Sequence, residues 1–134
     1  MTPIVLDTDA VSFIFKRDTR SELYLPHTQE RPAMISFMTE AELERWALQA
    51  GWGGHRIIRL RHFLKQFLVV PSSTELNRKW AAVMVQARAA GRRIETADAW
   101  IAATALLYDA PLATHNRSDY QGLPGLRMIT APAE

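Results

Sequence analysis

The sequence predicts an α/β fold in which a short parallel sheet of four to five strands carries helices on both faces. Short apolar runs rich in β-branched residues and leucine alternate along the chain with longer segments of helical periodicity. This alternation is typical of parallel strands joined by helical crossovers. The chain has 134 residues, so we expect one domain spanning 1–134.

The N-terminal part predicts a strand, a helix and an irregular segment. Residues 4–6 form an apolar run that ends at Asp7, which predicts a buried strand followed directly by a carboxylate. Asp9 is placed to cap a helix that carries the apolar residues of 11–15. Residues 17–32 are polar and contain two prolines, which predicts a loop or a broken helix.

A second strand and two further helical segments follow. Residues 34–36 predict the strand, and a helix is expected from 39 to 50, with Thr39 and Glu42 at the spacing of a capping box. After a glycine-rich break, residues 55–67 form a basic amphipathic segment.

The C-terminal half predicts three more strands and two helices. Ser72 and Glu75 have capping-box spacing and open a helix that ends near Gly91. Thr96 is expected to cap a helix over 97–108 that is apolar on nearly every face, so we expect it to be buried. The remaining apolar runs predict strands at 68–71, 112–114 and 127–129.

Composition excludes several classes of protein. Apolar residues make up 48% and charged residues 22%, as in ordinary globular proteins rather than disordered or collagen-like chains. There is no cysteine, which excludes a disulfide framework, a thiolate nucleophile and a cysteine-based metal site. No apolar run is long enough for a membrane span, and we expect a cytoplasmic location. The formal charge is +2, so attraction to nucleic acid must come from local patches.

Four carboxylates occupy positions where a parallel sheet usually binds its ligand. Asp7 follows the first strand, Glu42 and Asp98 lie in the first turns of two helices, and Asp119 follows the fourth strand. Sites in such sheets lie beyond the carboxyl ends of the strands, so we expect the four side chains to converge. Crowded carboxylates repel one another unless a hard cation neutralises them, and oxygen ligands select Mg²⁺ or Mn²⁺. Such an ion can activate water toward a phosphodiester, which is nuclease chemistry.

Each acid also has a simpler explanation. Glu42 could be half of the capping box, Asp98 could favour the positive end of its helix, and Asp119 could be a turn residue. Asp7 is harder to explain in this way, because an acid at the end of a buried strand must be solvated, paired or bound to metal.

Four blocks of sequence carry a resemblance to a known family. They are Ile4-Val5-Leu6-Asp7-Thr8-Asp9, Ile35-Ser36-Phe37-Met38-Thr39-Glu40-Ala41-Glu42-Leu43, Ala97-Asp98-Ala99-Trp100-Ile101-Ala102-Ala103-Thr104-Ala105 and Leu112-Ala113-Thr114-His115-Asn116-Arg117-Ser118-Asp119-Tyr120. In this order they closely resemble the PIN-domain ribonucleases, in particular the VapC toxins of bacterial toxin–antitoxin pairs. The resemblance spans essentially the whole chain and implies the PIN-like three-layer sandwich.

The resemblance also implies a site and partners. Asp7, Glu42, Asp98 and Asp119 would form a catalytic quartet around one or two Mg²⁺ ions, which Mn²⁺ can replace. Asp7 and Asp98 are the expected principal ligands, Asp119 a further ligand, and Glu42 completes the set or holds bound water. The implied activity is RNA cleavage by a metal-activated water, inhibited by a cognate VapB-type antitoxin. A homodimer or a higher toxin–antitoxin assembly is expected.

Polar residues around the quartet match family positions. We expect Thr8, Thr114 and Asn116 to orient the acids or a bound water. The third residue of the first block is often Asn or Ser in the family and is Asp9 here, which adds a fifth acid or a stronger helix cap. The aromatic residue after the last acid is commonly Phe in the family and is Tyr120 here, a change that should alter little.

Basic residues outside the quartet are candidates for RNA binding. Arg59 and Lys65 lie in the amphipathic segment, where a solvated helix face is an equally good account. Arg92 and Arg93 precede the Asp98 helix and could reach phosphate, or could simply belong to a loop. The four tryptophans are most simply core or interface residues, and base stacking is the minority interpretation.

Two alternative functions remain open. The chain could be a non-catalytic PIN-fold module that binds RNA or protein, or a PIN-type nuclease that cuts structured nucleic acid outside a toxin–antitoxin pair.

Overall fold

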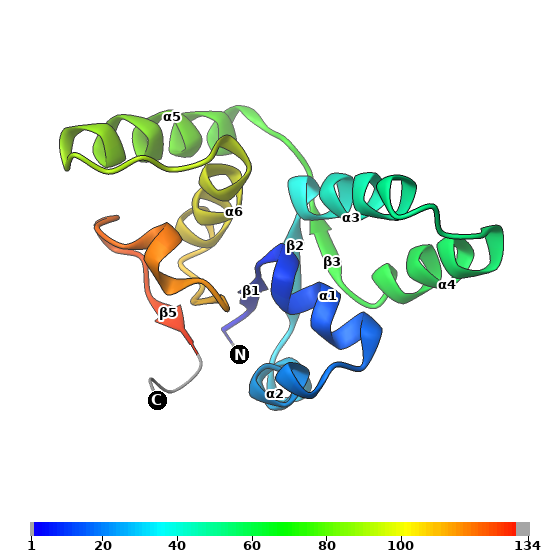
Figure 1. Ribbon diagram of the computed structural model, residues 1–134. Helices are drawn as coiled ribbons and strands as arrows, with labels where there is room; N and C mark the ends of the chain where they lie inside the picture. Colours follow the sequence, from blue (N-terminus) through cyan, green and yellow to red (C-terminus); the bar gives the residue numbers. More distant parts are fainter. Residues whose placement is uncertain (1, 131–134) are drawn as a thin grey trace.

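The computed structural model describes residues 2–130 and contains a five-stranded parallel sheet (Figure 1). The strand order is β3-β2-β1-β4-β5. The strands are β1 (Ile4–Leu6), β2 (Ala33–Ser36), β3 (Leu68–Val70), β4 (Leu112–Ala113) and β5 (Met128–Ile129). All five coincide with predicted strands to within one or two residues, so the predicted α/β class and parallel sheet are confirmed.

The helices connect these strands and lie on either side of the sheet (Figure 1). Residues 17–32 form a broken helix, which is one of the two structures predicted for this segment. The helical elements are α1 (Thr8–Lys16), the 3-10 turn η1 (Thr19–Leu23), α2 (Leu25–Glu30), α3 (Phe37–Gln49), α4 (Gly54–Leu64), α5 (Thr74–Ala89), α6 (Thr96–Leu107) and the 3-10 turn η2 (Arg117–Tyr120). Within residues 2–130, no helix is long and apolar enough to cross a membrane.

The central strand β1 divides the core into two clusters, because successive side chains of a strand point to opposite faces. Val5 packs with buried residues of α5 and α6 on one face. Ile4 and Leu6 pack with buried residues of α1, α3 and α4 on the other. All three β1 side chains are fully buried, so Asp7 leaves the strand at a point enclosed by both layers.

Helix α6 contributes most to the first cluster, as its uniformly apolar sequence predicts. Its buried residues include Ala99, Thr104 and the run 101–103, so α6 packs closely between the sheet and α5. The expected burial of this helix is confirmed. Its first turn, which carries Asp98, is thereby held at the edge of the sheet.

The predicted helix caps in the first half of the chain are wrong. Helix α1 begins at Thr8 and is capped by Asp7, whose Oδ1 accepts a hydrogen bond from the N–H of Ala10 at 2.9 Å. Asp9 therefore lies inside the helix. Helix α3 is capped by Ser36 rather than Thr39.

The two predicted caps in the second half are also displaced. The hydroxyl of Ser73, not of Ser72, accepts from the N–H of Leu76 at 3.1 Å. The predicted capping box of Ser72 and Glu75 is therefore wrong. Helix α6 has Glu95 at its cap position, without a side-chain hydrogen bond, so Thr96 is its first helical residue. In all four cases the chain turns into the helix one to three residues from the expected position. In α1, α3 and α5 the side chain at the observed cap position accepts from a free N–H group.

Candidate active site

Five acidic side chains line one small cavity at the carboxyl edge of the sheet. The cavity has a volume of about 90 Å³. Its lining residues are Asp7, Thr8, Asp9, Glu42, Trp46, Asp98, Asn116, Asp119 and Tyr120. The structure therefore brings all four predicted acids together, and Asp9 joins them.

Four elements position the four predicted acids, and α1 carries Asp9. Asp7 follows β1, Asp98 lies in the first turn of α6, and Asp119 lies in η2, which follows β4. Glu42 lies one turn further into α3 than the sequence predicts, because that helix begins at Phe37. The capping-box explanation of Glu42 is thus excluded.

Asp7 is the most buried member of the cluster, with 3% of its surface exposed. Both carboxylate oxygens are held: Oδ1 accepts from the Ala10 N–H, and Oδ2 accepts from the hydroxyl of Thr114 at 2.6 Å. Burial raises the pKa of Asp7 to about 7, the negative charges of Asp9 and Asp98 add to the rise, and the two hydrogen bonds oppose it. The fold therefore holds an acid where ionisation is costly.

Asp98 is perturbed in the same direction. Burial raises its pKa to about 6, and the neighbouring carboxylates of Asp119 and Glu42 raise it further. The Tyr120 hydroxyl donates to Oδ1 of Asp98 at 3.3 Å and opposes this rise. A cation in the cavity would thus stabilise the ionised forms of both Asp7 and Asp98.

Polar side chains connect Glu42 and Asp9 to the fold. The Thr8 hydroxyl donates to Oε1 of Glu42 at 2.7 Å and lies 3.1 Å from the hydroxyl of Thr39. The side-chain amide of Asn116 donates to Oδ2 of Asp9 at 2.6 Å. Each bond joins segments more than thirty residues apart, so the orientation of the acids depends on the complete fold.

Thr114 links two of these groups. Its hydroxyl donates to Asp7 and accepts a hydrogen bond from the backbone N–H of Asn116 at 3.0 Å. The contacts agree with the predicted positions of Thr8, Thr114 and Asn116 beside the acids. Whether they orient a bound water stays a prediction.

Protein cations do not neutralise this cluster. Within residues 2–130, the acids that form ion pairs are Asp18, Glu44 and Asp109, with Arg20, Arg61 and Arg127 respectively. All three pairs lie outside the cavity. The same part of the chain contains no three carboxylate or imidazole groups already spaced to hold one metal ion.

The donor set of the cavity nevertheless fits a hard divalent cation. Its possible ligands are carboxylate, hydroxyl and amide oxygens, and none is sulfur. Burial and neighbouring carboxylates raise the pKa values of Asp7 and Asp98. Mutual repulsion keeps such carboxylates apart until a cation lies between them. A small adjustment of side-chain rotamers on cation binding is the expected consequence.

Two cavity residues were not assigned to the site from the sequence. Trp46 lies four residues after Glu42 on α3, so helical periodicity alone places both on one face. Tyr120 was expected to differ little from Phe, yet its hydroxyl contacts Asp98. The signal for Tyr120 was the hydroxyl itself, which needs a partner when buried.

The RNA-binding candidates lie at different distances from the acids. Arg92 and Arg93 line a cavity of about 220 Å³ whose wall includes Asp119. Arg59 lines a cavity of about 560 Å³ near α1 and α4, which has no acidic lining residue. Lys65 caps the end of α4 and is exposed. The cavities therefore place Arg92 and Arg93 beside Asp119, whereas the cavity that Arg59 lines contains none of the acids.

Comparison with known proteins gives the family. Residues 4–121 match the PIN domain family. The chain belongs to that family. It is 31% identical over 135 residues to VapC ribonuclease Y4jK from Sinorhizobium fredii, covering 94% of this chain and 95% of the relative. It is also 30% identical over 98 residues to Ribonuclease VapC4 from Mycobacterium tuberculosis, covering 72% of this chain and 75% of the relative. The relatives place this PIN domain among the VapC proteins.

Solved structures agree with this fold. VapBC2 from Rickettsia felis, bound to a DNA fragment from its promoter, superposes with a TM-score of 0.85 at 18% identity, covering 97% of this chain and 99% of the other. DNA-bound VapBC from Salmonella typhimurium superposes with a TM-score of 0.85 at 20% identity, covering 97% and 98%. At these identities the likeness concerns the fold, and it confirms the predicted PIN-like sandwich.

Proposed function

We propose that this protein is the toxin of a type II toxin–antitoxin system and a divalent-metal-dependent endoribonuclease. The observation that carries the proposal is the set of five carboxylates around one cavity, without a protein cation among the described residues to neutralise them. The two relatives named VapC ribonuclease support RNA as the substrate. The VapBC complexes among the structural neighbours support a VapB-type antitoxin as the partner.

Asp7, Asp98 and Asp119 are the proposed metal ligands, with Asp7 and Asp98 as the principal pair. Mg²⁺ is the expected ion, and Mn²⁺ can replace it, because both prefer oxygen ligands. When bound, such an ion lowers the pKa of water and stabilises the charge that develops on a phosphodiester. Glu42 completes the ligand set or holds a bound water.

The other residues of the cavity orient these groups. Thr114 and the Ala10 N–H fix both oxygens of Asp7, while Tyr120 and Thr8 hold Asp98 and Glu42. Asn116 fixes Asp9. Fixed carboxylates need little rearrangement during the reaction, which favours catalysis by electrostatic preorganisation. Water is the nucleophile, and no covalent enzyme intermediate is required.

The direct test is RNA cleavage by purified protein. Wild-type protein should cut RNA in Mg²⁺, EDTA should stop the reaction, and Mn²⁺ should restore it. Asp98→Asn should lower the rate at least about a hundredfold, because it removes a charged ligand from the ion that activates water. Full activity of Asp98→Asn in Mg²⁺ would refute the assignment, and cleavage that continues in EDTA would refute the metal requirement.

The toxin role has its own test in cells. Expression of the wild-type chain should arrest growth, and co-expression of the protein encoded next to it should relieve the arrest. Harmless overexpression of folded, metal-loaded protein would contradict this role. We further propose a homodimer, for which exposed apolar residues on α5 such as Val85 offer a surface, and light scattering of the purified toxin tests it.

A further inference from the structure

The turn of residues 114–116 leads from β4 to η2 and holds two acids of the cavity of about 90 Å³, which we call the acid cavity. Thr114 donates to Oδ2 of Asp7 at 2.6 Å. The side-chain amide of Asn116 donates to Oδ2 of Asp9, also at 2.6 Å. The orientation of both carboxylates therefore depends on how this turn is held.

His115 lies at the centre of the turn and anchors it to the N-terminal part of the chain. The N–H of Thr114 bonds to the carbonyl of Ile129 at 3.0 Å, so β5 holds the start of the turn. The ring of His115 meets the ring of Phe13 edge to face, with centroids 5.0 Å apart. Nδ1 of His115 lies 3.3 Å from the hydroxyl of Tyr24, which is 91 residues away in the sequence. The imidazole thus links the turn to α1 and to the junction of η1 and α2.

Tyr24 is itself held firmly at that junction. Its ring is fully buried, its N–H donates to the carbonyl of Ser21, and its carbonyl accepts from the N–H of His27, each at 3.0 Å. Burial raises the pKa of its hydroxyl to about 12, and the negative charges of Asp7 and Asp9 add to the rise. The hydroxyl therefore keeps its proton at neutral pH and can donate to Nδ1 of a neutral imidazole. A buried tyrosine hydroxyl requires such a partner.

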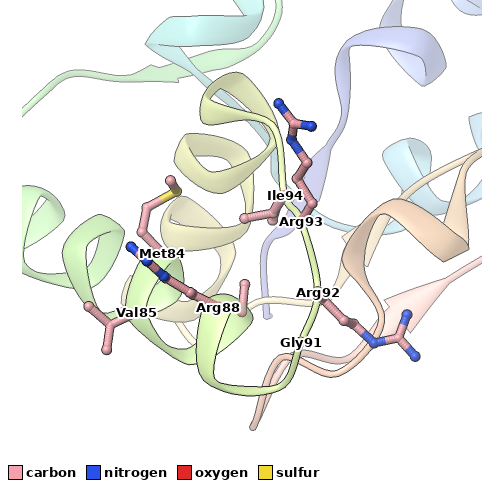
Figure 2. A pocket seen from close by; sticks show the side chains of 8 residues that line it. Met84, Val85, Arg88, Gly91, Arg92, Arg93 and Ile94 are labelled. Atoms are coloured by element: carbon pink, nitrogen blue, oxygen red, sulfur yellow. The ribbon is translucent and has the colours of Figure 1, made fainter.

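The segment between α5 and α6 also borders the acids but lacks such an anchor among the residues described. Residues 91–94 line the cavity of about 220 Å³ that includes Asp119. Figure 2 shows the side chains of Arg92 and Arg93 leaving this segment in different directions. Within residues 2–130, neither takes part in an ion pair or a guanidinium–ring contact. Of these two segments, the one that orients carboxylates is the one with a buried anchor.

We propose that Tyr24 and His115 are positioning residues for the metal site. Their hydrogen bond fixes the turn, and the turn presents the hydroxyl of Thr114 and the amide of Asn116 to two carboxylates of the acid cavity. Neither Tyr24 nor His115 lines that cavity, so the pair acts through these contacts and not on the metal ion or the RNA. Partners that orient metal ligands contribute to metal affinity and to activity. The proposal rests on the proposed function and adds two residues to it.

The first test measures Mn²⁺ affinity, because this readout does not require turnover. Tyr24→Phe removes the hydroxyl and keeps the buried ring. It should bind Mn²⁺ at least about fivefold more weakly than wild type, because the turn loses a fixed partner. Electron paramagnetic resonance counts free Mn²⁺ during the titration. Tyr108→Phe removes the same atom from an exposed tyrosine at the end of α6, and this matched control should bind as wild type does.

The second test concerns the acceptor. His115→Leu removes Nδ1 and should weaken Mn²⁺ binding as Tyr24→Phe does. His115→Asn offers an acceptor oxygen near the position of Nδ1 and should bind to within about twofold of wild type. Adding Tyr24→Phe to His115→Leu should cause no further loss, because both changes remove the same hydrogen bond. His62→Leu, at an exposed position on α4, is the control for the loss of an imidazole.

Two further measurements separate positioning from packing. In ¹H–¹⁵N NMR spectra, the side-chain amide of Asn116 should shift in Tyr24→Phe and not in the tyrosine control, because its bond to Asp9 depends on the turn. Urea denaturation measures the free energy of unfolding of each variant. A bond that served packing alone would lower that free energy and leave the Mn²⁺ affinity of the folded protein unchanged.

Each result decides the proposal. Unchanged Mn²⁺ affinity in folded Tyr24→Phe, an unmoved Asn116 amide, or equal losses in His115→Leu and His115→Asn would each overturn it. Circular dichroism identifies a variant that fails to fold, and the two His115 variants then carry the test.

RNA cleavage by the wild-type protein is measured in parallel. If wild type binds Mn²⁺ and cuts RNA while Tyr24→Phe binds Mn²⁺ equally well, the positioning role is wrong and the proposed function stands. If wild type neither binds Mn²⁺ nor cuts RNA, the proposed function fails, and the positioning role fails with it.

Discussion

Asp7 and Asp18 perform the same local task in two very different regions. Asp7 caps α1 by accepting from the Ala10 N–H, and Asp18 caps η1 by accepting from the Arg20 N–H, each at 2.9 Å. Asp18 is solvated and also accepts two hydrogen bonds from the Arg20 guanidinium, which hold its pKa well below the usual range. Asp7 is buried without a cation, and its pKa rises to about 7.

The comparison separates the requirements of a helix cap from those of the acid cavity. A helix cap requires one accepting oxygen, and an exposed aspartate supplies it without burying charge. The position of Asp7 adds a desolvation cost that the cap does not require. Such a cost is typical of functional sites, where a perturbed group is held for its chemistry.

The largest expected contrast is in RNA cleavage. Asp7→Asn should lower the rate at least about a hundredfold, because it removes a negative oxygen from the proposed metal site while leaving an oxygen to cap α1. Asp18→Asn is the matched control and should cleave at the wild-type rate. Cleavage assays under single-turnover conditions make the comparison, and equal rates for the two variants would contradict the different roles assigned here.

A smaller contrast should appear in stabilisation by metal. Mg²⁺ at a hundred times its dissociation constant should stabilise the wild-type protein by about 2.7 kcal/mol, because it binds the native state alone. Asp18→Asn should keep this stabilisation, and Asp7→Asn should lose most of it. Thermal denaturation with and without Mg²⁺ measures the effect. An equal rise in Tm for both variants would place the binding elsewhere.

Without divalent cations, a change in pH should alter the contributions of Asp7 and Asp18 to the stability of the fold in opposite directions. The pKa of Asp7 is higher in the folded than in the unfolded chain, so its contribution to stability is lost as pH rises from about 4 through about 7. At pH 8 in EDTA, Asp7→Asn should therefore be more stable than wild type, by on the order of 2 kcal/mol. Urea denaturation at pH 5 and pH 8 tests this, and a wild-type stability that increases over this interval, with no gain from Asp7→Asn, would contradict it.

The smallest effect is expected at the exposed pair. The pKa of Asp18 is lowered in the folded state, so its contribution is present above about pH 4 and lost as pH falls below that value. Because both groups are solvated, Arg20→Ala should lower Tm less than any change above, and high salt should reduce the difference. A loss larger than the effect of Asp7→Asn would show that burial does not separate the two regions.

The sequence predicted the sheet well, because its strands are short apolar runs between helices, and β1, β2 and β4 are almost wholly buried. It also predicted that Asp7, Glu42, Asp98 and Asp119 converge, since each follows or faces the end of a strand. The helix caps were displaced because capping depends on where the backbone turns, and Ser36 and Ser73 stand within three residues of the expected Thr39 and Ser72.

Contacts between distant segments were the hardest to predict. Thr114 contacts Asp7, and Asn116 contacts Asp9, each across 107 residues. The family resemblance indicated that these polar residues lie near the site, and the structure supplies their partners. Trp46 and Tyr120 carry apolar rings that sequence assigns to the core by default, although the helical spacing of Trp46 from Glu42 and the hydroxyl of Tyr120 were available as signals for the cavity.

Binding of Mn²⁺ tests most directly whether the buried carboxylates hold a metal ion. Electron paramagnetic resonance counts free Mn²⁺ during titration of the wild-type protein, Asp7→Asn, Asp98→Asn and Asp18→Asn. Wild type and Asp18→Asn should bind Mn²⁺ with the same affinity, and the other two variants should bind at least tenfold more weakly. Equal affinity in all four proteins would contradict the assignment of the acid cavity as the metal site.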